Sequence, residues 1–316
     1  MCEHSTRNAS IGLLLSVLER HDGRVAESAD AQDLGSCGVT RAGSSPASPT
    51  LTERLPMGLD IPYGYLSFAV RTDRGRVRLA NEDAVFAAIR YGIFGVCDGL
   101  GGAKGGAEAS RIIVQTMEEY FEQPPLPAAM TSHAYRVLLA VQAIYEAGRR
   151  IRLYAAQHGF EGMASTATFL LFGAAEERRA TLLHVGDTLA FRFRDDGLKQ
   201  LFTPHNVEAE AGEEADRLPP SLRRLLTRAV GIAAHEKMDP TPIDVAPGDV
   251  FLIASDGLTN MVPLYHIAEL LEEVRTDGVE RVADRLIAEA NAAGGRDNIS
   301  VVVVAVSDRT ASPPGR

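Results

Sequence analysis

Residues 95–102 are Gly-Val-Cys-Asp-Gly-Leu-Gly-Gly, an apolar run that ends in an aspartate and a glycine-rich turn. The run predicts a buried strand, and the glycines after it let the backbone turn sharply and approach a ligand closely. The Asp98 carboxylate and the Gly99 carbonyl are hard oxygen donors, which Mg²⁺ and Mn²⁺ prefer. Taken alone, the stretch also fits an ordinary Asp-Gly turn between a strand and a helix.

Three further acidic clusters lie beside small or turn-forming residues, close to apolar runs. They are Asn81-Glu82-Asp83, Ser255-Asp256-Gly257 and Arg296-Asp297-Asn298. Carboxylates at strand ends can converge in space while the strands hold them rigid. Four such clusters therefore predict a site for a divalent metal ion.

An arginine precedes the first of these clusters. Arg78 lies four residues before Glu82, and on an extended segment it could reach the same cleft. A planar guanidinium is the natural bidentate partner of a phosphate. The alternative is a solvent-facing arginine, and the spacing does not decide between the two, because other arginines lie close by at 71, 74 and 76.

Composition limits the class of protein. The 316 residues carry 42 acidic and 32 basic side chains, a formal net charge of −10, which argues against a nucleic-acid partner. Three cysteines are too few for a disulfide framework, so we expect a reducing compartment. Cys97 lies inside an apolar strand, so we expect its thiol to be buried. The apolar stretch at 11–18 is too short to span a membrane or to act as a signal peptide, so we expect a cytoplasmic protein.

The first 60 residues differ from the rest of the chain. Residues 26–52 are rich in Ser, Ala, Gly and Asp without any period, which predicts a disordered extension. A second interpretation is that residues 1–56 are spurious. The codons of Gly43-Ser44-Ser45-Pro46 can spell the T-arm consensus of a transfer-RNA gene, and the true start would then be Met57. Residues 61–308 are expected to form one catalytic domain, and 309–316 a disordered tail.

From residue 66 onward, short strands and longer helices are predicted in groups. Eight strands are expected, at 66–70, 84–89, 92–97, 167–172, 180–185, 189–193, 250–254 and 299–306. Four helices are expected, at 106–122, 132–157, 264–275 and 278–292. Strands in groups with helices in adjacent pairs favour an α+β fold with antiparallel sheets.

Three local features complete the prediction. The strands at 180–185 and 189–193 flank Gly186-Asp187-Thr188, which predicts a β-hairpin. Residues 203–231 carry an acidic run and then three arginines, and are expected to form a partly helical, solvated flap that either contacts substrate or is plain surface. In the second helix, one face is expected to hold Val137, Leu138, Val141, Ile144 and Tyr145.

The ordered motifs resemble those of the metal-dependent protein serine/threonine phosphatases of the PPM family, also called the PP2C family, in the bacterial form. The resemblance covers about residues 64–307. It rests on Arg78-x-x-x-Glu82-Asp83, residues 96–102, Gly162-Met163-Ala164-Ser165-Thr166, His184-Val185-Gly186-Asp187, residues 226–231, residues 254–258 and Gly295-Arg296-Asp297-Asn298-Ile299-Ser300.

This resemblance implies a β-sandwich of two antiparallel sheets flanked by paired helices, with two Mn²⁺ or Mg²⁺ ions in a cleft at one edge. It implies that Asp98 bridges both ions, Gly99 offers its carbonyl, and Asp256 and Asp297 hold the second ion. Glu82 acts mainly through water and Asp83 supports it. Arg78 grips the phosphate, and a bridging water attacks phosphoserine or phosphothreonine in proteins. A bacterial Ser/Thr kinase would be opposed in signalling.

Some positions depart from the family pattern. Leu100 stands where many eukaryotic members have a histidine proposed as general acid; His205 is another available histidine. Asn260 replaces a frequent aspartate, and residues 155–160 lack an acidic residue, so that only Asp187 remains for a third metal ion. Two other functions are weighed: a non-catalytic regulator that binds phosphoproteins, and a phosphatase dedicated to a sigma-factor regulatory phosphoserine protein.

Overall fold

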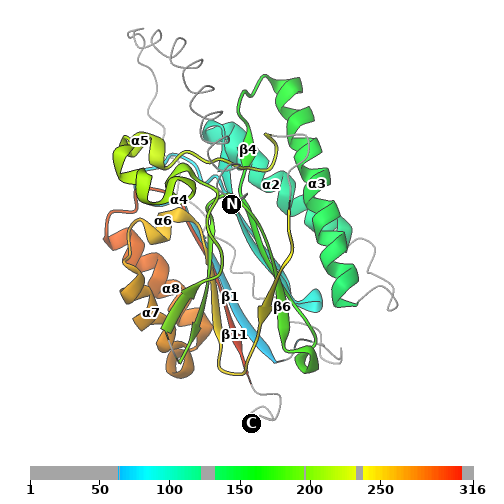
Figure 1. Ribbon diagram of the computed structural model, residues 1–316, viewed down its shortest axis with the longest axis vertical. Helices are drawn as coiled ribbons and strands as arrows, with labels where there is room; N and C mark the ends of the chain where they lie inside the picture. The colour runs from blue at the N-terminus through cyan, green and yellow to red at the C-terminus, as the bar shows by residue number, and fades with distance from the viewer. Residues whose placement is uncertain (1–62, 64, 122–131, 196, 233–237, 308–316) are drawn as a thin grey trace, which may run out of the picture. The chain divides into compact units, whose positions relative to one another are not determined.

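Two antiparallel β-sheets form the centre of the protein in the computed structural model, which describes residues 63, 65–121, 132–195, 197–232 and 238–307 (Figure 1). In spatial order, the first sheet consists of β1 (Leu66–Asp73), β11 (Ile299–Val306), β10 (Val250–Ala254), β7 (Leu189–Arg194) and β8 (Gly197–Gln200). The second consists of β2 (Asp83–Ala88), β3 (Ile93–Leu100), β5 (Ala167–Phe172), β6 (Arg179–Val185) and β9 (Thr241–Asp244), with the short β4 (Ala164–Ser165) paired to the end of β3.

Two pairs of helices cover the outer faces of the sheets (Figure 1). Helices α2 (Gly102–Phe121) and α3 (His133–His158) pack on the second sheet, and α7 (Leu264–Glu272) and α8 (Val274–Ala292) pack on the first. Helix α3 begins after Ser132, whose hydroxyl accepts a hydrogen bond from the Tyr135 amide, and ends at Gly159 in the left-handed conformation. The result is a four-layer α–β–β–α domain.

Three apolar layers hold the domain together. One lies between α2, α3 and the second sheet, one between the two sheets, and one between the first sheet and α7 and α8. Strand β10 is buried at every position and β11 at all but one, because each is covered on one side by the other sheet and on the other by helices. Continuous runs of Val, Ile and Leu are typical of strands buried on both faces.

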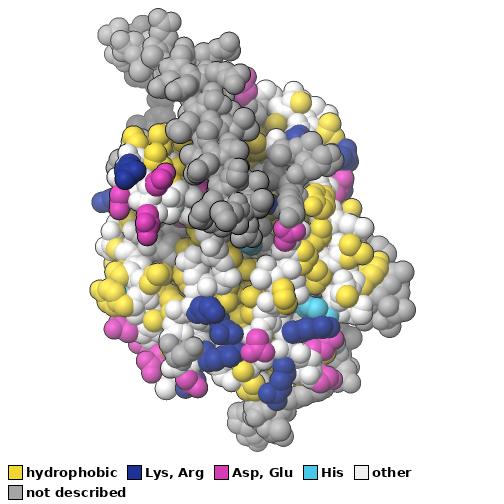
Figure 2. All heavy atoms as spheres, in the orientation of Figure 1, with side chains coloured by type: hydrophobic (Ala, Val, Ile, Leu, Met, Phe, Trp, Pro, Cys, Tyr) yellow, Lys and Arg dark blue, Asp and Glu magenta, His cyan; other side chains and the backbone are white. Residues whose placement is uncertain are grey.

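Six short helical segments complete the described elements. They are η1 (Ile89–Tyr91), η3 (Ala175–Glu177), α4 (Val207–Ala211), η4 (Gly212–Arg217), α5 (Pro220–Arg223) and α6 (Asp256–Thr259). Three of them, α4, η4 and α5, lie within residues 203–231. On the face shown in Figure 2, Lys and Arg side chains gather at the end of the sheets opposite to α4, α5 and α6.

The α+β fold with two antiparallel sheets is confirmed. All eight expected strands and all four expected helices are present, with ends shifted by a few residues. The buried thiol is confirmed as well, since Cys97 is 0% exposed. Three short strands, β4, β8 and β9, were not expected. They have two to four residues, and β9 contains Pro242, so neither length nor composition marks them.

The predicted β-hairpin is wrong. Strand β6 pairs with β5 and β9 in the second sheet, whereas β7 pairs with β10 and β8 in the first. Residues 186–188 therefore carry the chain from one sheet to the other. Two threonines near the start of β5 hold this crossing in place. Thr166 Oγ1 lies 2.8 Å from the Asp98 amide and 2.6 Å from Thr188 Oγ1. The Thr168 hydroxyl donates a hydrogen bond to the Thr188 carbonyl.

The predicted face of α3 is also partly wrong. Leu138 and Tyr145 are 54% and 41% exposed, although Ile144 is buried. The buried face consists mainly of small residues, namely Ala140, Ala143, Ala147 and Gly148, followed by Ile151. Small side chains let α3 lie close to α2 and the sheet. The buried face of α3 therefore follows the positions of the alanines, and the positions of the large apolar residues do not identify it.

Two expectations concern segments outside the described residues. These are the extension at 1–60, with its alternative start at Met57, and the tail at 309–316. Among the residues that the structure does describe, none of the helices combines the length and the apolarity needed to cross a membrane.

Candidate metal and phosphate site

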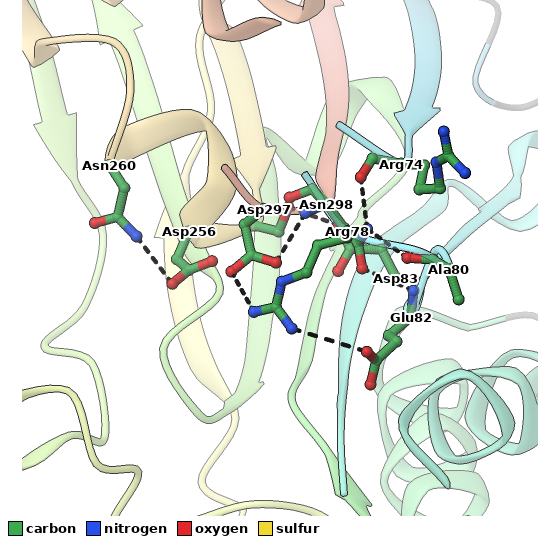
Figure 3. A network of polar contacts seen from close by, with 10 residues as sticks. Arg74, Arg78, Ala80, Glu82, Asp83, Asp256, Asn260, Asp297 and Asn298 are labelled. Atoms are coloured by element: carbon green, nitrogen blue, oxygen red, sulfur yellow. Dashed lines mark hydrogen bonds and ion pairs between the residues drawn. The ribbon is translucent and has the colours of Figure 1, made fainter. Parts of the chain in front are cut away.

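The four acidic clusters meet at one end of the two sheets. Asp83 opens β2 and lies opposite Asp98, near the end of β3. Asp256 follows β10 as the first residue of α6, and Asp297 lies two residues before β11. Because β10 and β11 are antiparallel neighbours, the end of one and the start of the other lie at the same edge. Figure 3 shows Asp83, Asp256 and Asp297 on adjoining elements there.

Asp83 and Asp98 are direct cross-strand partners. Side chains at such positions lie about 5 Å apart at Cβ, and like charges there repel each other. Asp83 is 9% exposed. Burial raises its pKa to about 7, even though the Ser255 hydroxyl donates a hydrogen bond to its Oδ2 at 2.8 Å. Burial, followed by the charge of Asp83, raises the pKa of Asp98 well above its usual range.

Two more carboxylates share this environment. Burial and then the charge of Asp297 raise the pKa of Asp256, whose Oδ2 accepts a hydrogen bond from Asn260 Nδ2 at 3.0 Å. Burial and then the charge of Asp256 raise the pKa of Asp187 to about 7. Asp187 thus lies within electrostatic reach of the cluster.

Arg78 is the arginine that faces these carboxylates. Its Nη2 lies 2.7 Å from Asp297 Oδ2, and its Nη1 lies 3.9 Å from Glu82 Oε1 (Figure 3). Arg71 instead pairs with Glu280 and Asp284 on α8, and the Arg74 side chain donates to the carbonyl of Leu79. The structure therefore selects Arg78 among the neighbouring arginines, a choice that spacing left open.

Two glycines allow the backbone to close around Glu82. A Cβ built on Gly106 would lie 2.0 Å from Glu82 Oε2 and 2.8 Å from the Gly99 carbonyl oxygen. A Cβ on Gly99 would lie 2.0 Å from the carbonyl oxygen of Gly106. Only glycine fits at either position, so the start of α2 packs directly against the end of β3.

The donor set suits hard divalent cations. It is made of oxygen atoms, and burial, followed by the excess of negative charge, raises the pKa values of Asp83, Asp98 and Asp256. Asp83 Oδ1 is buried without a hydrogen-bond partner, as expected for an atom whose partner is a cation. In the described part of the chain, no three acidic, His or Cys side chains stand close enough to enclose an ion, and the Arg78 guanidinium lies against Asp297.

Sequence reasoning missed the groups that hold these side chains in place. Asn298, 4% exposed, binds the backbone on both sides of Arg78. Ser255 links Asp83 to β11, because its Oγ also accepts a hydrogen bond from the Ser300 amide. Both lie next to expected ligands in the sequence. The only available signal was therefore this adjacency, since the hydrogen-bond partners of the two side chains lie 43 to 224 residues away.

His205 is unsuited to act as a proton donor. The Gly186 amide lies 3.2 Å from its Nδ1, and Arg228 Nη1 lies 3.1 Å from its Nε2. Both neighbours are donors, so they favour the neutral ring, which has one acceptor nitrogen. Burial, followed by the charge of Arg228, lowers the pKa of His205 to about 4.

Two sheets flanked by helix pairs, with a buried carboxylate cluster and an arginine at one edge, define the class of metal-dependent protein phosphatases. The family model described as protein phosphatase 2C matches residues 73–290, and the chain belongs to this family. The prediction of a metal-dependent serine/threonine protein phosphatase is thereby confirmed.

Relatives with known names cover most of the chain. The serine/threonine phosphatase Stp of Listeria innocua is 32% identical over 243 residues, which are 74% of this chain and 93% of the relative. The serine/threonine protein phosphatase PstP of Mycobacterium tuberculosis is 32% identical over 255 residues, 77% of this chain and 45% of that longer protein.

Solved structures agree with the fold. PppA of Pseudomonas aeruginosa superposes with a TM-score of 0.68 at 28% identity, covering 77% of this chain and 99% of that one. The catalytic domain of PstP, determined with two manganese ions, gives a TM-score of 0.64 at 30% identity, with coverage of 77% and 99%. The expected Mn²⁺ or Mg²⁺ cofactor is confirmed for the family to which this chain belongs.

Proposed function

We propose that this phosphatase hydrolyses phosphoserine and phosphothreonine in bacterial proteins and opposes a Ser/Thr kinase in the cytoplasm. One observation carries the proposal: Arg78, a phosphate-binding type of side chain, points into a cluster of buried carboxylates that needs cations. A binding module would need the arginine but not a costly set of buried like charges.

The proposed ligand assignment is the one that the resemblance to the family implies. Asp98 and the Gly99 carbonyl, at the end of β3, would help to hold the ions. Asp256 and Asp297, from the other sheet, would hold the second ion. Glu82 and Asp83 complete the set, Glu82 through water. When bound, the two ions supply Lewis-acid charge and a water that is acidic enough to give a nucleophile at neutral pH.

Arg78 would bind the non-reacting oxygens of the phosphate. Its side chain is 48% exposed, and its partner Asp297 is partly exposed as well. Fixed between two carboxylates, it is oriented before substrate arrives, which lowers the entropic cost of binding. The phosphate would replace Asp297 as the partner of Arg78, and Asp297 would be released to a metal ion.

Two ions suffice for this assignment. Asp187 is close enough to influence Asp98 and Asp256 and could contribute to a third ion. Asn260, however, turns an amide N–H towards Asp256, and this donor has no affinity for a cation. The leaving serine or threonine oxygen would take its proton from water or from another group, because Leu100 and His205 offer no acid.

The flap at 203–231 supports a substrate-contacting role. Arg224 lies close enough to Asp256 for its charge to lower the pKa of that carboxyl, which brings the flap to the rim of the site. A rim that carries a cation suits a phosphorylated protein, and surface segments of this kind often carry binding residues.

The test is phosphate release by the full chain from p-nitrophenyl phosphate and from a phosphothreonine peptide. We expect turnover with Mn²⁺ or Mg²⁺ and none with chelator. Asp284→Asn, which removes a surface partner of Arg71, serves as the control and should keep full activity. Peptide binding without turnover at any metal concentration would support the regulator instead. Turnover of one regulatory phosphoserine protein alone would support the dedicated phosphatase.

A further inference from the structure

Asn298 joins both ends of the segment that carries Arg78. Its Nδ2 donates hydrogen bonds to the carbonyl oxygens of Arg74 and Ala80, each at 2.9 Å (Figure 3). Its Oδ1 accepts one from the Glu82 amide at 2.8 Å. Both amide protons and the carbonyl oxygen are therefore engaged, in a side chain that is 4% exposed.

The segment between these carbonyls has no regular secondary structure of its own. Residues 74–82 contain no helix and no strand, so no ladder of hydrogen bonds fixes their backbone. The amides of Arg76 and Val77 both point at the Gly295 carbonyl, at 2.7 and 3.3 Å. These contacts hold the middle of the segment, and Asn298 holds its two ends.

Asn298 also fixes the partner of Arg78. Its own amide donates to Asp297 Oδ1 at 2.9 Å, while Arg78 contacts the other oxygen, Oδ2, at 2.7 Å. A single residue thus orients both the loop that presents the guanidinium and the carboxylate that receives it. Asn298 therefore acts on the position of Arg78 through the loop backbone and through Asp297.

We propose that Asn298 is a positioning residue for phosphate binding, which holds Arg78 at the height and direction that a bound phosphate requires. The inference rests on the proposed function, because it takes Arg78 as the phosphate ligand. Without the side-chain amide of Asn298, the carbonyl oxygens of Arg74 and Ala80 lose their hydrogen-bond donor. The two ends of the loop are then no longer held to the residue that precedes β11. The Gly295 contacts remain, so the loop persists with Arg78 less well placed.

The consequence is a specific kinetic signature. A misplaced Arg78 weakens binding of substrate and of free phosphate alike, whereas the carboxylates near the end of β3 and directly after β10 keep their positions. Glu82 also stays anchored, because its carbonyl oxygen accepts hydrogen bonds from the Gly99 amide at 3.1 Å and the Ser110 hydroxyl at 2.6 Å. We expect Asn298→Ala to raise KM for p-nitrophenyl phosphate about tenfold and to change kcat less than about threefold. The size of the effect is reasonable, because a displacement of a positioned group by about 1 Å can lower the reaction rate by up to about 100-fold. The inhibition constant of inorganic phosphate should rise by the same factor as KM.

A double-mutant cycle separates positioning from general damage. In an Arg78→Ala background, Asn298→Ala should change KM less than about twofold, because the group that it positions is gone. The control is Asn291→Ala, which removes another largely buried asparagine, bonded to Asp73 Oδ1 at 3.1 Å near the base of the same loop. It should lower Tm and leave KM unchanged.

The outcomes distinguish this inference from the proposed function. If the wild-type chain has no metal-dependent activity, the proposed function fails. If the wild type is active but Asn298→Ala leaves KM and the phosphate inhibition constant unchanged, the positioning role is wrong. Additive effects of Asn298→Ala and Arg78→Ala would overturn it too. Should Asn298→Ala not fold, Asn298→Ser keeps one donor, and the same cycle is measured with that variant.

Discussion

Asp83 and Asp98 lie directly opposite each other at the paired ends of β2 and β3, the least favourable arrangement for two carboxylates in a sheet. Burial raises both pKa values, that of Asp83 from 3.8 to about 7, and the charge of Asp83 raises the pKa of Asp98 further. Like charges directly opposite each other destabilise a sheet unless a cation compensates them. The pair is therefore a cost to the fold that binding of a metal ion removes.

The first prediction concerns pH and stability. A carboxyl group with a raised pKa in the folded state stabilises the fold while it is protonated, and that stability is lost as the pH rises through the folded pKa. For Asp83 and Asp187 the window extends from 3.8 to about 7. The chelated protein should have a lower Tm at pH 8 than at pH 5, measured by thermal unfolding.

Addition of Mn²⁺ should reverse this dependence. Ions compete with protons for the carboxylates, so the Tm gain on adding Mn²⁺ should be larger at pH 8 than at pH 5. An equal gain at both pH values would show that the ion binds elsewhere.

The second prediction separates stability from activity at Asp98. Asp98→Asn keeps the shape of the side chain and removes the repulsion from Asp83. In chelator at pH 8 the variant should be more stable than the wild type, with Tm higher by about 2–4 °C for each kcal/mol of repulsion removed.

Phosphatase activity of Asp98→Asn should fall at least about 100-fold, because Lewis-acid charge is worth several kcal/mol. Asp256→Asn should behave in the same way. A variant that is destabilised in chelator yet still active would contradict the ligand assignment.

The third prediction uses two neighbouring glycines of α2. A Cβ at Gly105 would meet Phe160 and Met163 at ordinary distances of 3.7 and 3.8 Å, whereas one at Gly106 would meet Glu82 Oε2 at 2.0 Å. Gly105→Ala should therefore stabilise the protein by about 0.5–1 kcal/mol, as alanine does within helices, and keep activity.

Gly106→Ala should displace the Glu82 carboxylate and abolish most activity. Denaturant unfolding and initial rates measure the pair. Equal rates for the two variants would mean that the packing of α2 against Glu82 is irrelevant to catalysis.

The fourth prediction concerns Arg78. Loss of a charge-assisted hydrogen bond costs about 1.5–3 kcal/mol, so Arg78→Ala should raise KM for phosphate esters about 10- to 100-fold. Arg78→Lys should recover part of this, because a point charge replaces the planar fork.

Arg74→Ala is the matched control. The Arg74 side chain bonds to the Leu79 carbonyl and turns away from the carboxylates (Figure 3), so its loss should leave KM within about twofold of the wild type. If the two alanine variants behave alike, the phosphate contact has been assigned to the wrong arginine.

The sequence predicted the sheets better than their connections. Strands such as β10 and β11 can be recognised in the sequence, because burial on both faces requires a continuous apolar run. The hairpin failed because residues 186–188 form a short turn whether the chain stays in one sheet or crosses to the other. Only the partners β5 and β10 decide between these two paths, and they lie elsewhere in the chain. The α3 face failed because alanines that pack closely carry little apolar signal.

The charged residues of the site could be predicted from the sequence, but the residues that hold them in position could not. Asp98 and Asp256 sit next to glycines at strand ends, a pattern that spacing alone reveals. That Arg78 and not Arg74 faces Asp297 depends on how residues 74–82 are folded, which Asn298 decides from more than 200 residues away. Such long-range hydrogen bonds leave no periodic trace in a sequence.

The most direct test of the central claim is phosphate release from a phosphothreonine peptide by the full chain, titrated with Mn²⁺ after complete chelation, with Asp98→Asn measured in parallel. The account predicts that activity returns with added Mn²⁺ in the wild type and stays at background in the variant. Undiminished activity in chelator, or equal recovery in Asp98→Asn, would contradict it.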